Sequence, residues 1–289
     1  MSVLPPRVRR ALLVGGAVLI FIILAGATYQ GVATALERRE FPRPGGLVSI
    51  GDHQLHIYCT GHGSPAVILE APAAGLSAAW GDVQSRLAAK TRVCSYDRAG
   101  LGWSEASDRP YDPGRVPEEL RALLSAAHER GPFVVVGQGL GAALAQLYAA
   151  RPDSEAVALV LIDPPPSTSD DRGDPVWVMT MSPWLARAGV LRAGRILSSK
   201  ARAMTGRSGG AVRAFLNRPD HLTRAAAEIV KWEDAARMAA ATPVRPEVTT
   251  TTVEVNARDR VAFLTAPADV DRAVAAIEAA VTAHAAKKL

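Results

Sequence analysis

The part of the sequence that most resembles a chemical site is a glycine-rich turn between an apolar run and a helix-forming run. The turn, 137–142, reads GQGLGA and follows the valines of 134–136. Its spacing, Gly-x-Gly-x-x-Ala, fits a dinucleotide-binding turn, where backbone N–H groups receive a pyrophosphate. Asp163 could serve as the ribose acid, but it lies farther along than the roughly 20 residues that the fingerprint expects. Dinucleotide binding at Gly137–Ala142 is therefore a remote alternative.

Strand-like and helix-like segments alternate on both sides of this turn. Continuous apolar runs at 66–71, 132–137 and 156–163 are typical of strands covered on both faces. The alternation predicts an α/β domain with a mostly parallel sheet and helices on both faces. From about residue 164 to 243 the pattern is only helical, and strand-type residues then return before a last amphipathic helix. This order predicts a helical cap over the carboxyl edge of the sheet.

Several segments resemble the α/β-hydrolase fold family, in particular a membrane-anchored or exported bacterial branch. They read LHIYCTGHGSPAVILEA, RVCSYDRAGLGWS, EELRALL, GPFVVVGQGLGAALAQLYAARP and LVLIDP, and LARAGVLRAGR is similar to the first cap helices. The resemblance is dense over about 46–163 and loose beyond. It implies an α/β-hydrolase domain over 47–289, with the cap at about 164–243.

In this family the glycine turn reads Gly-x-Ser-x-Gly and holds the nucleophilic serine on a sharp strand-to-helix elbow. Here Gly137, Gln138, Gly139, Leu140 and Gly141 occupy the five places. Glycine has no side chain that could attack a substrate. The resemblance therefore implies an elbow without its nucleophile.

The other catalytic positions also depart from the family pattern. The family's histidine corresponds to Arg260 in ARDRVAFLTAP, and arginine stays protonated and cannot act as a general base. His221 falls in the cap and His284 near the end of the last helix, so neither is a persuasive substitute. The strand and turn that carry the family's acid are shortened or missing after the cap, which leaves Asp259 and Glu247 as weak candidates.

The oxyanion loop is altered as well. It reads LEAPAAGL, with Pro72 where the family has a glycine. The backbone N–H groups of Ala73 and Leu140 would be the nearest equivalents of the two oxyanion donors. No residue is assigned a catalytic role by the family mechanism, and no cofactor or metal is predicted.

A relocated nucleophile is the rival hypothesis, which would make the protein an active exported hydrolase of the esterase or lipase kind. Ser95, Asp97 and Ser104 lie near the carboxyl end of the fourth strand, where this fold places functional groups. The competing interpretation is structural: Asp97 and Arg98 fix the loop SYDRAGLGWS by hydrogen bonds.

The N-terminal segment predicts a membrane helix. Residues 11–34 carry no charge, follow Arg7, Arg9 and Arg10, and exceed the roughly 20 residues that a span needs. We expect a cytoplasmic tail over 1–10, a single-pass signal anchor over 11–34 and a linker over 35–46. The globular domain would lie on the periplasmic side of the inner membrane. A cleaved signal peptide is the alternative, because ATA at 33–35 fits the cleavage rule.

The two cysteines, Cys59 and Cys94, each end a strand-like run. In the fold that the resemblance implies, the second and fourth strands are neighbours. With an exported domain, this placement favours a disulfide between them.

The first cap segment combines apolar and basic residues. Two interpretations stay open for it: packing against the hydrolase core, or a surface for lipid or a partner protein. The apolar residues are Trp177, Trp184, Leu185, Val190, Leu191 and Ile196, and the basic ones are Arg187, Arg192, Arg195, Lys200 and Arg202.

These features together predict a non-catalytic role. We expect a structural or accessory subunit that binds a protein, in or at the membrane, or a pocket for an acyl or other apolar ligand. The 33 basic and 28 acidic residues give a net charge of +5, spread along the chain without a basic block. Nucleic acid is therefore not an expected partner.

Overall fold

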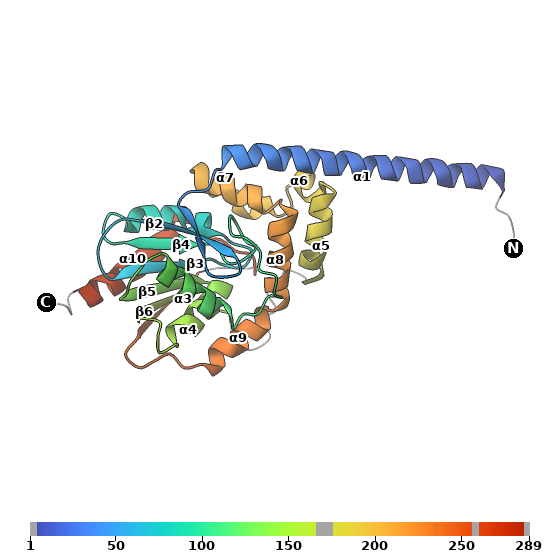
Figure 1. Ribbon diagram of the computed structural model, residues 1–289. Coiled ribbons are helices and arrows are strands. Elements are labelled where there is room, and N and C mark those ends of the chain that lie inside the picture. Colours follow the sequence, from blue (N-terminus) through green and yellow to red (C-terminus); the bar gives the residue numbers. More distant parts are fainter. Residues whose placement is uncertain (1–4, 166–175, 256–259, 286–289) are drawn as a thin grey trace.

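The structure is a computed structural model that describes residues 5–165, 176–255 and 260–285. Within these residues the domain is built on one seven-stranded sheet, ordered β1-β2-β4-β3-β5-β6-β7 (Figure 1). The strands from β3 to β7 run parallel, and at one edge β2 is antiparallel both to β4 and to the outer strand β1. The bounds are β1 Gly46–Ser49, β2 Gln54–Thr60, β3 Ala66–Glu70, β4 Val93–Tyr96, β5 Phe133–Gln138, β6 Ala156–Ile162 and β7 Thr249–Val253.

Helices cover both faces of the sheet, as the apolar runs predict. Every residue of β3 and β5 is buried, because side chains on both sides of these strands meet a helical layer. On one face the apolar cluster includes α3 (Val116–Ala126) and α4 (Leu140–Ala149). On the other it includes α2 (Gly81–Leu87) and α10 (Pro267–Ala285).

A helical cap follows β6, where the sequence predicts one. It packs on the sheet's carboxyl edge through a cluster that also contains Leu140 and Leu144 of α4. Between the cap and α10 the described residues form one strand, β7, which pairs with β6. The cap elements are α5 Val176–Arg187, α6 Val190–Gly194, η2 Ser198–Ala201, α7 Gly206–Phe215, α8 Pro219–Val230 and α9 Trp232–Ala241, and η1 Ser77–Trp80 precedes α2.

The N-terminal helix is longer than the predicted span. α1 covers Pro6–Glu40, so the helix continues through the first six residues of the expected linker, 35–40. No proline or glycine interrupts this stretch before Pro42, and the basic residues of the last turn favour the helix dipole. Among the described helices, α1 is the one long and apolar enough to cross a membrane, and none of its most apolar stretch is buried.

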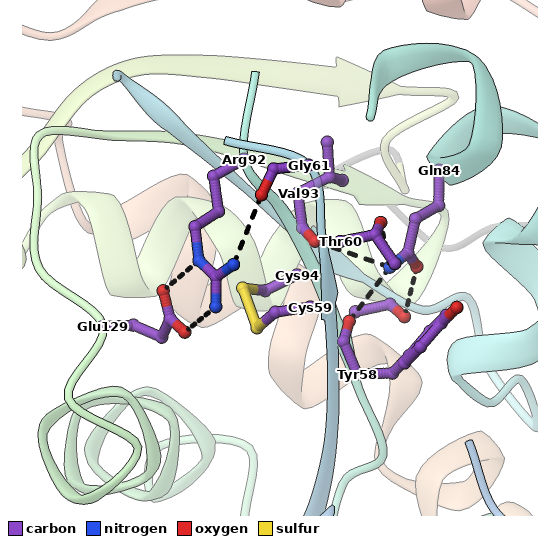
Figure 2. The surroundings of a disulfide bond; sticks show 10 residues. Tyr58, Cys59, Thr60, Gly61, Gln84, Arg92, Val93, Cys94 and Glu129 are labelled. Atoms are coloured by element: carbon purple, nitrogen blue, oxygen red, sulfur yellow. Dashed lines mark hydrogen bonds and ion pairs between the residues drawn. A yellow bond between two sulfur atoms is a disulfide. The ribbon is translucent and has the colours of Figure 1, made fainter. Parts of the chain in front are cut away.

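The two cysteines meet across the β2–β4 pair. The antiparallel register sets Cys59 opposite Cys94, and the structure joins them in a disulfide. Figure 2 shows the Arg92 side chain beside it, donating to the carboxylate of Glu129 with Nε at 2.8 Å. Since a free thiolate is the metal ligand that cysteine offers, the cluster of Cys59, Cys94 and Glu129 holds no thiolate for a metal.

Candidate functional site

The elbow at the end of β5 keeps its backbone geometry. Gly139 has φ 54° and ψ −122°, a combination that glycine adopts without the strain other residues meet. Its N–H donates to the carbonyl of Ile162 at 2.9 Å. A Cβ at Gly141 would collide with the backbone carbonyl of Ala71, so close packing of the elbow on β3 accounts for this glycine.

The position above Gly139 is filled by the cap. An added Cβ there would meet Cη2 of Trp232, at the start of α9, at 3.5 Å. Trp232 is only 1% exposed. The buried apolar cluster around the elbow includes Ala73, Leu140, Val261 and Phe263. The Trp232 indole therefore packs directly against the elbow, in ordinary van der Waals contact with a side chain placed at position 139. The first residues of α4 are also buried, so they leave no open place for a pyrophosphate.

The loop after β7 reaches the elbow. Gln138 Nε2 donates to the carbonyl of Ala262 at 3.3 Å. Arg260, at the histidine position, is mostly buried, and its Nη2 lies 3.7 Å from the carboxylate of Glu233 on α9. The residue that the sequence aligns with the family's histidine is thus a guanidinium that pairs with the cap.

Of the two acids that the sequence offers near this loop, the one that the structure describes is not part of the site. Glu247 is exposed, and its carboxylate pairs with Arg245 at 3.2 Å on the surface. Asp259 lies outside the described residues.

His221 is buried and has both ring nitrogens in use. Nδ1 accepts the Gly102 N–H at 3.0 Å, and Nε2 donates to the Ala74 carbonyl at 2.9 Å. Burial lowers the pKa of His221, and these two partners fix one neutral tautomer. No lone pair remains to take a proton from a nucleophile. His284 instead bonds the carbonyl of Ala280 within α10, at 2.9 Å.

The two serines proposed as relocated nucleophiles are hydrogen-bonded into the fold. Ser95 is fully buried, and its Oγ donates to Gln84 Oε1 at 2.6 Å. Ser104 Oγ donates to the Asp97 carbonyl at 2.5 Å and accepts the His56 N–H at 2.8 Å. Neither hydroxyl contacts a histidine ring in these bonds, so neither is paired with a general base.

The sequence analysis missed a buried trio of serine, histidine and acid. His56 Nδ1 lies 2.9 Å from an Asp97 carboxylate oxygen and 3.3 Å from Ser77 Oγ. His56 Nε2 faces the backbone carbonyl of Pro44. A catalytic triad places its serine and its acid on opposite ring nitrogens. Here both share Nδ1, and the other nitrogen must donate to a carbonyl, so the trio is not a proton relay.

Asp97 is the centre of this trio and anchors three segments. Its carboxylate accepts the backbone N–H groups of Ser77 at 2.5 Å and Trp103 at 2.9 Å. Burial by itself would raise the pKa of Asp97, but His56 and these hydrogen bonds together lower it below its ordinary value. The contacts give Asp97 the structural role that the sequence suggested as its alternative.

Arg98, the next residue, ties the cap to the oxyanion loop. Its guanidinium donates to both carboxylate oxygens of Glu228 on α8 at 2.7 Å, and to Glu70 at 2.6 Å. It also donates to the carbonyls of Ala71 at 2.7 Å and Pro72 at 3.0 Å. Burial raises the pKa of the Glu70 carboxyl. Arg98 therefore clamps the cap onto the sheet.

Two cavities lie away from the elbow, and Gly139 lines neither of them. The larger, of about 620 Å³, opens between the connector after α1, β2, α2 and α7, with Phe41, Tyr58 and Trp103 in its wall. The smaller, of about 470 Å³, lies between α1 and the cap.

Comparison with known proteins decides the family. The sequence model described as "Alpha/beta hydrolase family" matches residues 59–287. The chain belongs to this family. Curated relatives include an uncharacterized protein of Schizosaccharomyces pombe, 39% identical over 28% of this chain and 15% of its own. An uncharacterized vacuolar membrane protein of Saccharomyces cerevisiae is 34% identical over 30% of this chain and 14% of its own length. This chain thus spans well under half the length of these relatives.

Solved structures agree on the fold. An N-formylmaleamic acid deformylase of Pseudomonas putida superposes with a TM-score of 0.55 at 23% identity, over 77% of this chain and 84% of its own. A bacterial membrane phospholipase A superposes with a TM-score of 0.54 at 18% identity, over 93% of this chain and 88% of its own. An epoxide hydrolase gives 0.57 at 18% identity, over 82% and 96%. At these identities the likeness is one of fold alone.

Proposed function

We propose that this protein is a non-catalytic α/β-hydrolase homologue, a pseudoenzyme held at a membrane by α1. The observation that carries the proposal is Gly139 at the nucleophile position, covered by Trp232. Arg260 at the histidine position adds a second loss. In a comparable serine hydrolase, removing the nucleophile or the histidine alone costs about a million-fold in kcat.

The role that fits this closed site is that of a structural or accessory subunit for a protein partner in the membrane. Buried Arg98 bonds hold the cap shut over the elbow, so the protein offers its outer surface and α1 for binding. The larger cavity favours a second candidate, binding of a small ligand with an apolar part, because aromatic side chains contribute to its wall.

The location we propose is the inner membrane, with α1 as a single-pass signal anchor and the domain on the periplasmic side. The Cys59–Cys94 disulfide supports an oxidising compartment for the domain. The arginines do not decide the orientation, because Arg7, Arg9 and Arg10 before the apolar part of α1 are balanced by Arg38, Arg39 and Arg43 after it.

A fluorophosphonate probe, which labels activated serines, tests the absence of a nucleophile. We expect the purified full-length protein in detergent micelles to show no labelling above a heat-denatured sample. Ser77→Ala, Ser95→Ala and Ser104→Ala each remove one hydroxyl discussed above. Labelling of the native protein that disappears in one of these variants would identify a relocated nucleophile and overturn the proposal.

A further inference from the structure

Helices α5 and α6 leave a group of large apolar side chains uncovered. Trp177 and Trp184 are 67% and 66% exposed. Trp177, Met181 and Trp184 are spaced four and three residues apart, which puts them on one side of α5. Met179 and Ala186 of the same helix are buried in the cap core. The exposed group, called the tryptophan face below, consists of Trp177, Met181 and Trp184 of α5, Val190 of α6 and Ile196 just after α6.

The tryptophan face lies beside the membrane helix. A Cβ added at Gly26 of α1 would collide with the Ala188 carbonyl, and one added at Gly189 would lie 2.8 Å from the Gly26 carbonyl. The turn between α5 and α6 therefore touches the backbone of α1. In Figure 1, α5 runs crosswise to α1, and the amino-terminal part of α1 extends beyond it, clear of the domain.

The length of the free part of α1 sets the level of the bilayer. Residues 11–30 rise about 30 Å as a helix, which matches the hydrocarbon thickness of a typical bilayer. At the end of this stretch, Gln30 is buried, donates to the Asn217 carbonyl at 2.7 Å and accepts from Arg192 at 2.8 Å. The apolar span thus ends where α1 docks on the cap, close to the level of Gly26 and the α5–α6 turn.

Basic and aromatic side chains accompany the face at this level. The Arg187 guanidinium lies 5.2 Å from the centre of the Trp184 ring. Arg195 and Arg202 line the smaller cavity with Tyr29 of α1, which is half exposed. Tryptophan, tyrosine and arginine are typical of membrane–water interfaces, where a ring sits at headgroup depth and a guanidinium meets phosphate.

We propose that the tryptophan face inserts into the interfacial layer of the bilayer that α1 crosses, with Arg187, Arg195 and Arg202 at the headgroup phosphates. A helix that lies across a spanning helix lies along the membrane plane, as interfacial amphipathic helices do. The cap is then held by lipid on one side and by Arg98 on the other. This inference does not depend on whether the elbow is catalytic.

Tryptophan fluorescence in vesicles tests the insertion. The full-length protein is reconstituted in 7:3 phosphatidylcholine–phosphatidylglycerol vesicles, with or without phosphatidylcholine brominated near the headgroup end of its acyl chains. The chain has five tryptophans, and the other three, Trp80, Trp103 and Trp232, are buried or half-buried. We expect bromine quenching in the wild type and loss of most of it in Trp177→Phe/Trp184→Phe.

Trp103→Phe is the matched control, and it should keep the quenching. Quenching of the Trp177 and Trp184 emission by aqueous iodide, with none by bromolipid, would put the face in water and overturn the proposal. Protection from both quenchers would show that another protein surface, such as a second copy of the chain, covers it, and would also overturn it. Trp177 and Trp184 are exposed, so the melting temperature of the double variant should stay unchanged, which verifies its folding.

Discussion

Replacing Glu228 by glutamine tests the clamp between the cap and the sheet. Glu228 is fully buried, and both of its carboxylate oxygens accept hydrogen bonds from Arg98 at 2.7 Å. Glutamine keeps one acceptor oxygen but loses the second acceptor and the negative charge. Arg98 retains Glu70 at 2.6 Å, and Arg224, 3.7 Å from Glu228, loses its nearby charge.

The expected cost follows from burial. Breaking a buried ion pair by removing one partner costs about 3–5 kcal/mol, and the remaining bonds of Arg98 put Glu228→Gln near 3 kcal/mol. In a domain of this size, that lowers the melting temperature by about 6–12 °C. The measurement is thermal unfolding in detergent micelles by intrinsic fluorescence, to which buried Trp232, at the start of α9, contributes.

Glu247→Gln is the matched control for this prediction. It makes the same chemical change in a glutamate that is 64% exposed and pairs with Arg245 at the surface. Exposed pairs contribute about 0–1 kcal/mol, so its melting temperature should stay close to that of the wild type. Equal shifts in the two variants would refute the reasoning, because Glu228 would then not be a buried clamp.

Three further changes have defined outcomes. Reduction of the Cys59–Cys94 bond, with a sequence separation of 35, should cost about 4 kcal/mol by loop entropy and lower the urea midpoint; the Cys59→Ser/Cys94→Ser variant should start at the lower midpoint and show no further change with the reductant. Trp232→Ala should lower the free energy of unfolding by about 3–5 kcal/mol through the cavity above the elbow; a cost near zero would mean that the indole is not packed. Because burial lowers the pKa of His221 in the folded state, the unfolded chain binds that proton first, and stability falls as the pH drops from 7 through about 6.5. His221→Gln should flatten this slope in urea titrations between pH 5 and 7, whereas exposed His62→Gln should leave it; an unchanged slope in His221→Gln would contradict the assignment.

Much of the fold could be predicted because the sheet is covered on both faces. The continuous apolar runs at β3, β5 and β6 have no polar face, and a parallel sheet between helical layers is the arrangement that buries them. The cap could be placed because the pattern from about residue 164 to 243 is helical and contains no clear strand-like run. The helical end of α1 was not predicted, because its charged residues are also typical of a connector. No proline or glycine interrupts the helix there.

For the candidate site, the sequence could predict single positions within a motif but not the contacts between distant segments. Gly139 and Arg260 stand out because they replace residues within a known pattern of spacing. The pairing of His56 with Asp97 depends on the register of β2 with β4, and the placement of Trp232 above Gly139 depends on how α9 packs. Both are contacts between segments that are distant in the sequence, so no local sequence pattern predicts them.

The rate of p-nitrophenyl butyrate hydrolysis tests the central claim most directly. It is measured for the full-length protein and for Gly139→Ser, each against its heat-denatured sample. We predict that both match their denatured samples, because the wild type has no nucleophile at the elbow and Arg260 cannot take a proton from a serine placed there. Turnover by the wild type would contradict the non-catalytic account, and turnover by Gly139→Ser alone would show that a working base faces the elbow.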